Sequence, residues 1–344
     1  MTTLVTGAAG FLGSHVARLL VERGERVRVL LRPASATRLL DTLPANCVER
    51  AIGDLRDPAS LDRAVQGVDV IYHVAADYRL WARDPREIYD SNVNGTRNLL
   101  DAARRASVAK FIYTSTVGTV AVPRRDSLPD ESTSTTLGEM IGHYKRSKWL
   151  AEREVLRAAE QGLPVVVVNP TTPVGPGDAK PTPTGRMVVD FLNGRMPAYV
   201  DAGLNFVPVE DAAAGHLLAA GRGCLGERYI LGAENLTLKQ VLEMLSRASG
   251  RPAPRVRLPH CVALAAGYAD AAVSRLLGRE PRILLEGVRM ARHKMFVNAE
   301  RACRELGFAP GPVAAALERA VRWYEANGFV AGSHTARVAE ARAA

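Results

Sequence analysis

The chain has 344 residues, of which 47% are hydrophobic and 24% are charged. This composition is typical of a globular protein with a substantial core, and no low-complexity region is visible. The formal net charge is +9, but the Arg residues are scattered and form no basic block with interleaved aromatic residues. We therefore expect solvated surface charge and no nucleic-acid partner.

Four cysteines lie far apart in the chain and show no CxxC spacing: Cys47, Cys224, Cys261 and Cys303. Neither a disulfide framework nor a metal site is predicted, and the reducing cytoplasm is the expected location. No basic segment precedes the first apolar run, so no signal peptide is predicted.

The first half of the chain alternates short apolar runs, rich in β-branched residues, with helix-like segments. The predicted strands are 3–6, 27–31, 47–52, 69–74, 110–115 and 164–169, and the predicted helices are 11–23, 58–66, 87–106 and 143–161. Apolar runs without polar alternation are typical of strands buried on both faces of a parallel sheet. The pattern predicts an α/β fold with a Rossmann-type, doubly wound parallel sheet.

The texture changes after Asn169, where residues 170–185 are dense in Pro and Gly and predict a long loop. Beyond it we expect a strand at 228–231 and helices near 237–249, 258–277, 299–306 and 312–327. The predicted organisation is a Rossmann domain of residues 1–169 with 205–233 returning to it, a smaller and mostly helical substrate lobe of 170–204 and 234–330, and a disordered tail at 331–344.

The longest apolar stretch runs from Cys261 to Leu277 and is interrupted by Asp270 and Arg275. It is too short and too polar for a membrane span. We expect a packed helix, and the alternatives are a wall of an apolar substrate cavity or a contact with a membrane surface.

The first predicted strand leads into TGAAGFLG, in which Gly7, Gly10 and Gly13 are spaced three apart. Glycines at such a turn let the backbone approach a pyrophosphate, and the following helix presents its free N–H groups. Position between a strand and a helix is the context that this motif requires. It predicts nucleotide binding; the alternative is a Gly-rich helix start without a ligand.

The end of the second strand bears on the choice of dinucleotide. An NAD enzyme usually has Asp or Glu there, but this strand has Leu31, followed by Arg32 and then Arg38. A guanidinium pairs with a 2′-phosphate whereas a carboxylate repels it. NADP(H) is therefore favoured, with NAD(H) as the alternative if Arg32 is a solvated strand-end residue.

Seven motifs occur in an order and spacing that resemble the extended short-chain dehydrogenase/reductases. They are TGAAGFLG, GDLRD (53–57), HVAA (73–76), NVNGT (92–96), YTSTVGTV (113–120), YKRSK (144–148) and NPTTPVGP (169–176), and the likeness covers nearly the whole chain. Through GHYKRSKWLAE (142–152) and YRLW (78–81) the chain is similar to the hopanoid-associated sugar epimerase group, which is itself similar to dihydroflavonol reductases.

The resemblance implies a catalytic site of Thr116, Tyr144 and Lys148, with Ser115 as the neighbouring alternative to Thr116. Asn92 matches the residue that organises a water molecule near the lysine. The implied cofactor contacts are Gly7, Gly10, Phe11, Leu12, Gly13, Arg32, Asp54, Leu55, Ala75, Ala76, Thr114, Tyr144, Lys148, Pro170 and Thr172. His73 lies in an apolar strand and is interpreted as a core histidine with satisfied hydrogen bonds.

Tyr144 and Lys148 are spaced to lie one helical turn apart on one face. A free Tyr titrates near pH 10, but a cation about 4 Å away, at an effective dielectric near 20, is worth roughly 4 kcal/mol, or about three pK units. We therefore expect Lys148 to lower the pKa of Tyr144 toward neutral pH, where general acid–base catalysis is efficient. The alternative is an ordinary packed pair.

Two loops are expected to bind the substrate, because open α/β sheets bind ligands beyond the carboxyl ends of their strands. One loop carries Tyr78 and Trp81, and the other carries Lys180 and Arg186. Together they suit a ligand with an apolar portion and a polar or anionic portion. Solvated loops are the alternative.

The resemblance implies an NAD(P)-dependent oxidoreductase that transfers hydride at a secondary alcohol or ketone carbon, similar to hopanoid-associated sugar epimerases and acting on a sugar- or lipid-linked small molecule. The alternatives are an NADPH-dependent carbonyl reductase similar to dihydroflavonol 4-reductases and a non-catalytic NADP(H) sensor. Helices 87–106 and 143–161 form a dimer contact in many members of the superfamily, so a homodimer is expected.

Overall fold

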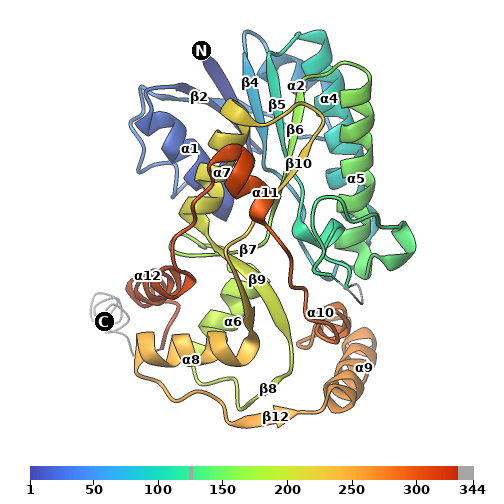
Figure 1. Cartoon of the computed structure of the whole chain (residues 1–344), viewed down its shortest axis with the longest axis vertical. Coiled ribbons are helices and arrows are strands. Elements are labelled where there is room, and N and C mark those ends of the chain that lie inside the picture. The colour runs from blue at the N-terminus through green and yellow to red at the C-terminus, as the bar shows by residue number, and fades with distance from the viewer. Residues whose placement is uncertain (124–126, 332–344) are drawn as a thin grey trace. The chain divides into compact units, whose positions relative to one another are not determined.

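The chain is shown in Figure 1 as a computed structural model, which describes residues 1–123 and 127–331. The chain divides into two compact units, here called the first and the second unit. The first contains residues 1–171, 210–232 and 297–309, and the second contains 172–209, 233–296 and 310–344. From residue 332 onward the predicted tail lies outside the described residues.

A seven-stranded parallel sheet forms the centre of the first unit, with strand order β10-β6-β5-β4-β1-β2-β3. The strands are β1 (Thr2–Thr6), β2 (Arg26–Leu31), β3 (Val48–Ile52), β4 (Val70–His73), β5 (Lys110–Thr114), β6 (Val165–Pro170) and β10 (Arg228–Leu231). Neighbouring strands β1 and β4 mark the point at which the chain order reverses. This arrangement confirms the predicted doubly wound sheet.

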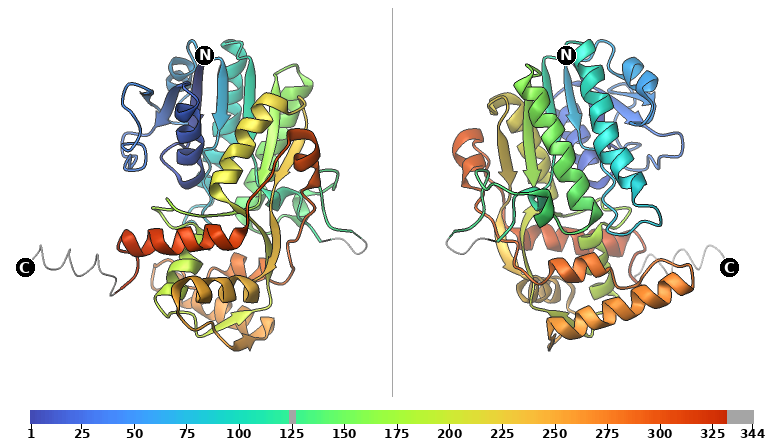
Figure 2. Two further views of the ribbon diagram at one scale, coloured as in Figure 1. Left: turned by 60° about the vertical axis from the view of Figure 1, so that its left-hand side comes forward. Right: turned by 90° about the vertical axis from the view of Figure 1, so that its right-hand side faces the viewer.

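Helices cover both faces of this sheet, as the two views in Figure 2 show. On one face lie α1 (Phe11–Glu22) and α7 (Val209–Arg222), and on the other lie α2 (Pro58–Ala64), α4 (Gly95–Arg105) and α5 (Gly142–Glu160). The second face buries a continuous apolar cluster that includes Leu99, Phe111 and Val155. The helix predicted at 87–106 is divided into α3 (Arg86–Tyr89), a π-helix at Asp90–Asn94 and α4. The short helix α11 (Glu300–Leu306) also belongs to this unit.

The second unit combines two small sheets with five helices in its described part. The strands are β7 (Thr172–Val174), β9 (Gly203–Pro208) and β11 (Glu234–Thr237) in one sheet and β8 (Ala198–Val200) and β12 (Val256–Leu258) in the other. The helices are α6 (Pro183–Leu192), α8 (Leu238–Ser249), α9 (His260–Leu276), α10 (Leu285–Met290) and α12 (Val313–Ala326). Side chains of α6, α8 and α12 build its core, among them Phe191, Leu245 and Leu317.

Two regions of the second unit differ from the sequence-based expectation. The loop expected over 170–185 contains β7 and the first turn of α6, which begins at Pro183 with the Thr182 side chain accepting a hydrogen bond from the Gly185 N–H. Helix α9 was expected to be packed, but its buried residues are Gly267 and Ser274, while Leu276 is 87% exposed. None of the helices in the described residues is long and apolar enough to cross a membrane.

Candidate active site

The turn after β1 is shaped by its glycines. Gly7 has a φ of +72°, and a Cβ atom there would lie 2.6 Å from the Ala75 backbone nitrogen, so a side chain is excluded. A Cβ on Gly13 would lie 2.2 Å from the Gly7 carbonyl oxygen, so glycine lets α1 approach the turn closely. Gly10 closes the turn by donating its N–H to the Gly7 carbonyl oxygen at 2.9 Å.

The first turn of α1 presents backbone N–H groups without competing side chains. Its N-cap is Gly10, which supplies no capping side chain, and the first turn contains no acidic residue. Phe11 and Leu12 are partly exposed. Since helix N-termini carry unpaired N–H groups and a partial positive charge, this turn suits an anionic group.

Tyr144 lies in the first turn of α5 and is partly exposed. Burial of its hydroxyl group raises the pKa of Tyr144, and a hydrogen bond with the Thr116 side chain lowers it in opposition. Thr116 lies just after β5, where its side-chain oxygen also accepts a hydrogen bond from the Gly118 N–H at 3.2 Å. The structure therefore brings together two predicted catalytic residues, Thr116 and Tyr144.

Lys148 is buried, with 2% of its surface exposed. Its ammonium donates to the Tyr113 hydroxyl and to the Thr114 carbonyl oxygen, both at 2.8 Å. The same nitrogen lies 4.4 Å from the centre of the Tyr113 ring, within the range of a cation–π contact. Burial lowers the pKa of Lys148 to about 7, although the Glu152 carboxylate acts in the opposite direction.

We expected Lys148 to lower the pKa of Tyr144. For the charged groups of the protein alone, this prediction is wrong. The lysine lies one turn from Tyr144 as predicted, but its hydrogen bonds go to Tyr113 and Thr114. The net direction of the Tyr144 pKa is upward because the cost of burying a phenolate exceeds the benefit of the Thr116 hydrogen bond.

The Ser115 side chain points into a buried polar network. Its hydroxyl donates a short hydrogen bond to a carboxylate oxygen of Glu152, which is 4% exposed. The same oxygen accepts from the Thr119 hydroxyl and from the Asn169 amide nitrogen, both at 2.9 Å. Ser115 therefore belongs to the buried network next to the site. Thr116 is the residue of the two that forms a side-chain hydrogen bond with Tyr144.

The other carboxylate oxygen of Glu152 accepts from Arg228 at 3.1 Å. Arg228 also donates to the Glu131 carbonyl oxygen at 2.5 Å, and the Glu131 carboxylate accepts from the Ile230 N–H at 2.7 Å. Burial raises the pKa of Glu131. The network thus ties helix α5 to the edge strand β10.

Asn92 lies in the π-helix and is 2% exposed. Its side-chain oxygen accepts from the Asp77 N–H at 2.7 Å, and its amide nitrogen donates to the Asp77 carbonyl oxygen at 2.8 Å and to the Ser147 hydroxyl at 2.9 Å. These contacts fix the loop after β4 to α5. The predicted role of Asn92 in organising a water molecule stays a prediction.

His73 is buried at the end of β4 with both ring nitrogens engaged. Nδ1 lies 2.7 Å from the Thr6 hydroxyl and Nε2 lies 3.0 Å from the Thr96 hydroxyl. Burial, with a smaller contribution from Lys148, lowers the pKa of His73 to about 3. The geometry agrees with the interpretation as a core histidine.

The profile of the NAD dependent epimerase/dehydratase family matches residues 3–232. A putative dihydroflavonol 4-reductase of Synechocystis sp. is 43% identical over 330 residues, which cover 95% of both chains. Sterol demethylase protein B of Methylococcus capsulatus is 38% identical over 332 residues, covering 96% of this chain and 100% of that protein. A solved structure described as that of gox2253 matches with a TM-score of 0.85 and 46% identity, covering 96% and 99% of the two chains.

The chain belongs to the NAD dependent epimerase/dehydratase family. The predicted likeness to extended short-chain dehydrogenase/reductases and to dihydroflavonol reductases is thereby confirmed. This family and its relatives comprise NAD(P)-dependent oxidoreductases, epimerases and dehydratases, so the prediction of an enzyme of this class is also confirmed.

The residues present fit the dinucleotide of the epimerase/dehydratase family. The turn after β1 packs closely against the chain at the end of β4, because Gly7 has no Cβ to meet the Ala75 backbone, which precedes Ala76. This is the point of strand-order reversal, where doubly wound sheets bind nucleotides. The pyrophosphate would be held by the residues of this turn, namely Gly7, Gly10, Phe11, Leu12 and Gly13. The Lys148 ammonium donates to the Thr114 carbonyl oxygen at the end of β5.

Arg32, Asp54 and Leu55 follow two neighbouring strands of the same edge. The side-chain hydrogen bond from Arg56 lowers the pKa of Asp54 to about 2. Arg32 is exposed, and its charge makes a smaller contribution in the same direction. Arg56 approaches the Asp54 carboxylate at 2.7 Å. Leu55 is buried against Gly95, where a Cβ would lie 2.7 Å from the Leu55 Cβ.

The predicted substrate residues are divided between the two units. Tyr78 and Trp81 are each 37% exposed in the loop after β4, in the first unit. Lys180 and Arg186 are exposed in the second unit. Pro170 ends β6 in the first unit, and Thr172 is the first residue of the second.

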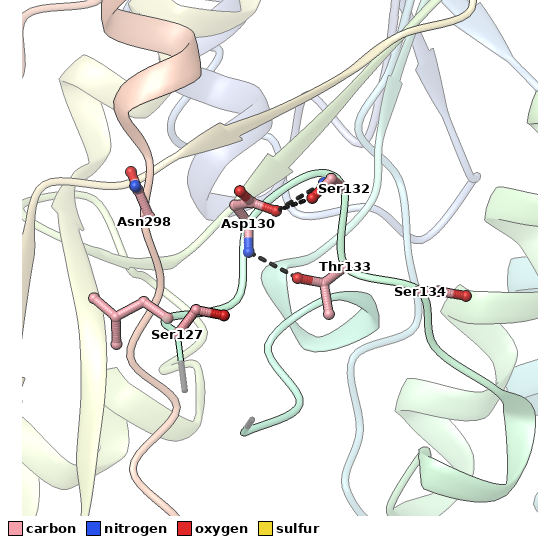
Figure 3. A pocket seen from close by; sticks show the side chains of 7 residues that line it. Ser127, Asp130, Ser132, Thr133, Ser134 and Asn298 are labelled. Carbon is pink, nitrogen blue, oxygen red and sulfur yellow. Dashed lines mark hydrogen bonds between the residues drawn. The ribbon is translucent and has the colours of Figure 1, made fainter. Parts of the chain in front are cut away.

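A cavity of about 640 Å³ lies away from all predicted site residues (Figure 3). Its lining is polar, and the polar groups bond to one another: Asp130 accepts from the Ser132 hydroxyl at 2.6 Å, and its N–H donates to Thr133 at 2.9 Å. Within the described residues no cluster of His, Cys, Asp or Glu is arranged to hold a metal.

Sequence reasoning missed Tyr113 and Glu152. Tyr113 is a fully buried phenol in β5, next to the apolar Phe111 and Ile112, and Glu152 lies one helical turn after Lys148. Both positions carried a signal, because a hydroxyl or carboxylate on a face expected to be buried requires a polar partner.

Proposed function

We propose that this enzyme interconverts a ketone and a secondary alcohol on a largely apolar ring substrate, with Tyr144 as the general acid/base. The observation that carries the proposal is that Thr116, just after β5, lies next to Tyr144 in the first turn of α5, where its side-chain hydrogen bond opposes the rise in the Tyr144 pKa. Two donors at one point suit a carbonyl oxygen that gains negative charge during reduction. The bound nicotinamide supplies or accepts the hydride.

The protonation state of Tyr144 favours reduction at neutral pH. Because burial raises its pKa, the phenol is protonated and can donate its proton to the substrate oxygen. The Lys148 ammonium donates to Tyr113 and Thr114. Burial raises the pKa of Tyr113, and charge on Glu152 and on Tyr144 adds to this rise, so these groups are electrostatically linked. We assign Lys148 to binding the nicotinamide ribose.

The apolar ring substrate is supported by two observations. Relatives that cover 95% or more of this chain are named for a dihydroflavonol and for a sterol, both ring compounds. The loop after β4 also offers two aromatic side chains, Tyr78 and Trp81. Lys180 and Arg186 are proposed to bind a polar or anionic portion.

The test compares wild type with Tyr144→Phe in NADPH oxidation, using a dihydroflavonol and a 3-keto sterol as probes. We expect the variant to lose at least about 100-fold in rate. Tyr199→Phe, a phenol in β8, serves as the matched control. Equal rates for wild type and Tyr144→Phe would remove Tyr144 from the mechanism, and NADPH binding without any turnover would favour the sensor alternative.

A second candidate is sugar epimerisation of the hopanoid-associated type, which the match to an epimerase family profile over residues 3–232 favours. Epimerisation uses the same residues but retains the cofactor through oxidation and reduction. Cofactor extracted from purified protein distinguishes the two: tightly held NAD(H) supports the epimerase, and reversible binding of NADPH supports the reductase.

We also propose NADP(H) as the preferred cofactor. Arg32 is exposed beyond β2, and the nearby Asp54 carboxylate, which would repel a 2′-phosphate, is already paired with Arg56. Arg32→Asp should weaken NADPH binding about tenfold or more and leave NADH binding nearly unchanged. Arg26→Asp at the other end of β2 is the control; an unchanged preference in Arg32→Asp contradicts the assignment. The predicted homodimer and cytoplasmic location stay predictions.

A further inference from the structure

Helix α9 turns an apolar face to solvent. Its exposed positions recur at helical spacing along one side and are occupied by Val262, Ala265, Ala266, Tyr268, Ala269, Ala272, Val273 and Leu276, followed by Leu277. Leu276 and Leu277 are 87% and 67% exposed. The side turned inward carries the buried Gly267 and Ser274 and the half-buried Asp270, which reverses the usual amphipathic pattern.

Contacts within the second unit hold this face outward. Helix α10 packs against the inner side of α9, where a Cβ on Gly267 would lie 3.3 Å from a Leu285 methyl group. The Asp270 carboxylate accepts from Arg279 at 2.9 Å and from the Ile283 N–H at 2.8 Å, which fixes the connection between the helices. Ile283 itself is 36% exposed and adds to the apolar surface.

The stretch of chain that contains the apolar face is rich in positive charge, although Arg257 and Lys294 pair with Asp201 and Arg279 pairs with Asp270. Residues 251–294 contain nine Arg or Lys and three Asp or Glu, so most of the chain's excess positive charge lies here. Arg275, Arg282 and Arg292 are exposed and take part in none of the ion pairs formed by the described residues. Arg289 stacks on the Tyr268 ring at 5.5 Å and donates to its hydroxyl at 2.7 Å.

We propose that the face formed by α9, Leu277 and Ile283, here called the α9 surface, binds lipid bilayers that contain anionic lipids. Apolar side chains beside Arg residues are the composition of helices that lie in a membrane interface, with the apolar side among the acyl chains and the cations at the head groups. With 17 residues and a charged residue on each of its polar edges, α9 lies in the interface and does not cross it. This inference does not depend on the proposed function.

The test is cosedimentation of the full chain with vesicles of phosphatidylglycerol and phosphatidylcholine, compared with vesicles of phosphatidylcholine alone. We expect binding to the anionic vesicles that decreases as salt rises. Leu276→Glu should reduce the bound fraction about tenfold, because it places a charge where an exposed leucine would insert among acyl chains. Leu225→Glu, which alters a 57% exposed leucine of the first unit, should bind as wild type does.

A double variant, Arg275→Glu with Arg282→Glu, separates charge from apolar contact. It should lose the preference for anionic vesicles while its circular dichroism spectrum stays unchanged. Absence of vesicle binding by wild type, or equal binding by Leu276→Glu, overturns the proposal. The proposal is also overturned if wild type is a dimer that does not bind vesicles and Leu276→Glu is a monomer. The α9 surface would then be a contact between two copies of the chain.

Discussion

Helices α5 and α9 depart from the ordinary burial rule in opposite directions. Helix α5 buries Lys145, Lys148 and Glu152, whereas α9 exposes Val273 and Leu276. Charged side chains are seldom fully buried unless paired, and contiguous apolar surfaces are seldom left exposed. Each departure costs stability, so each indicates a role: chemistry for α5 and binding for α9.

Removing Glu152 should produce the largest effect on stability. Glu152→Ala removes the carboxylate that pairs with Arg228 and accepts hydrogen bonds from Ser115, Thr119 and Asn169. We expect a loss of about 3 kcal/mol in the free energy of unfolding, measured with urea. Glu160→Ala, at the exposed end of the same helix, is the control, and equal losses would show that the buried network contributes nothing.

The buried lysines of α5 should make stability depend on pH. Burial lowers the pKa of Lys148 to about 7 and that of Lys145 to about 8, well below the usual pKa of a lysine. Between these values and about pH 10 the unfolded state binds more protons, so the free energy of unfolding should rise with pH, by about 1 kcal/mol per unit for each lysine. Urea midpoints between pH 7 and 9.5 measure this rise. Lys148→Met should remove about half of it; a flat profile in wild type contradicts the assignment.

Tyr113→Phe tests how Lys148 is positioned. The variant keeps the ring but loses the hydroxyl that accepts from the ammonium at 2.8 Å, so the charged form of Lys148 is less stable. We expect kcat/KM to fall about tenfold and its pH profile to shift toward lower pH. Tyr72→Phe, a buried phenol in β4, should behave as wild type does. An unchanged pH profile in Tyr113→Phe would leave Thr114 as the relevant partner of the lysine.

Leu276→Ala should have the smallest effect. Since Leu276 is 87% exposed, its truncation should change the free energy of unfolding by no more than about 0.5 kcal/mol. Val155→Ala, on the buried side of α5, should cost about 2 kcal/mol. A large loss from Leu276→Ala would mean that the α9 surface is covered by protein in solution.

The sheet could be predicted because its strands carry an unambiguous signal. Strand β6 is fully buried and begins with four consecutive valines, Val165 to Val168, as is typical of two-sided strands of parallel sheets. Helix α6 was missed because its start at Thr182 and Pro183 was interpreted as part of a loop, although a Thr cap before Pro is also a helix start signal. Helix α7 begins at Val209, directly after Pro208 ends β9, so no loop separates the two elements.

The positions of the candidate site residues along the chain could be predicted more readily than the contacts between their side chains. The spacing of Tyr144 and Lys148 fixed their relation along α5, since one helical turn places both on one face. The contacts of the Lys148 ammonium could not be inferred, because the end of a four-carbon side chain can reach another element. Here it reaches β5 at Tyr113, which no spacing along the helix predicts.

The Asn92 side chain has an evolutionary consequence. Its amide bonds to both backbone groups of Asp77 as a peptide unit would, and to Ser147 on α5. The start of the loop after β4, which carries Tyr78 and Trp81, is thus held to α5 through its backbone at Asp77 and not through the side chains of the loop. Mutations that change Tyr78 or Trp81 therefore leave these contacts with the helix that bears Tyr144 in place, so under the proposed role of this loop substrate preference can change separately from the proposed acid/base residue.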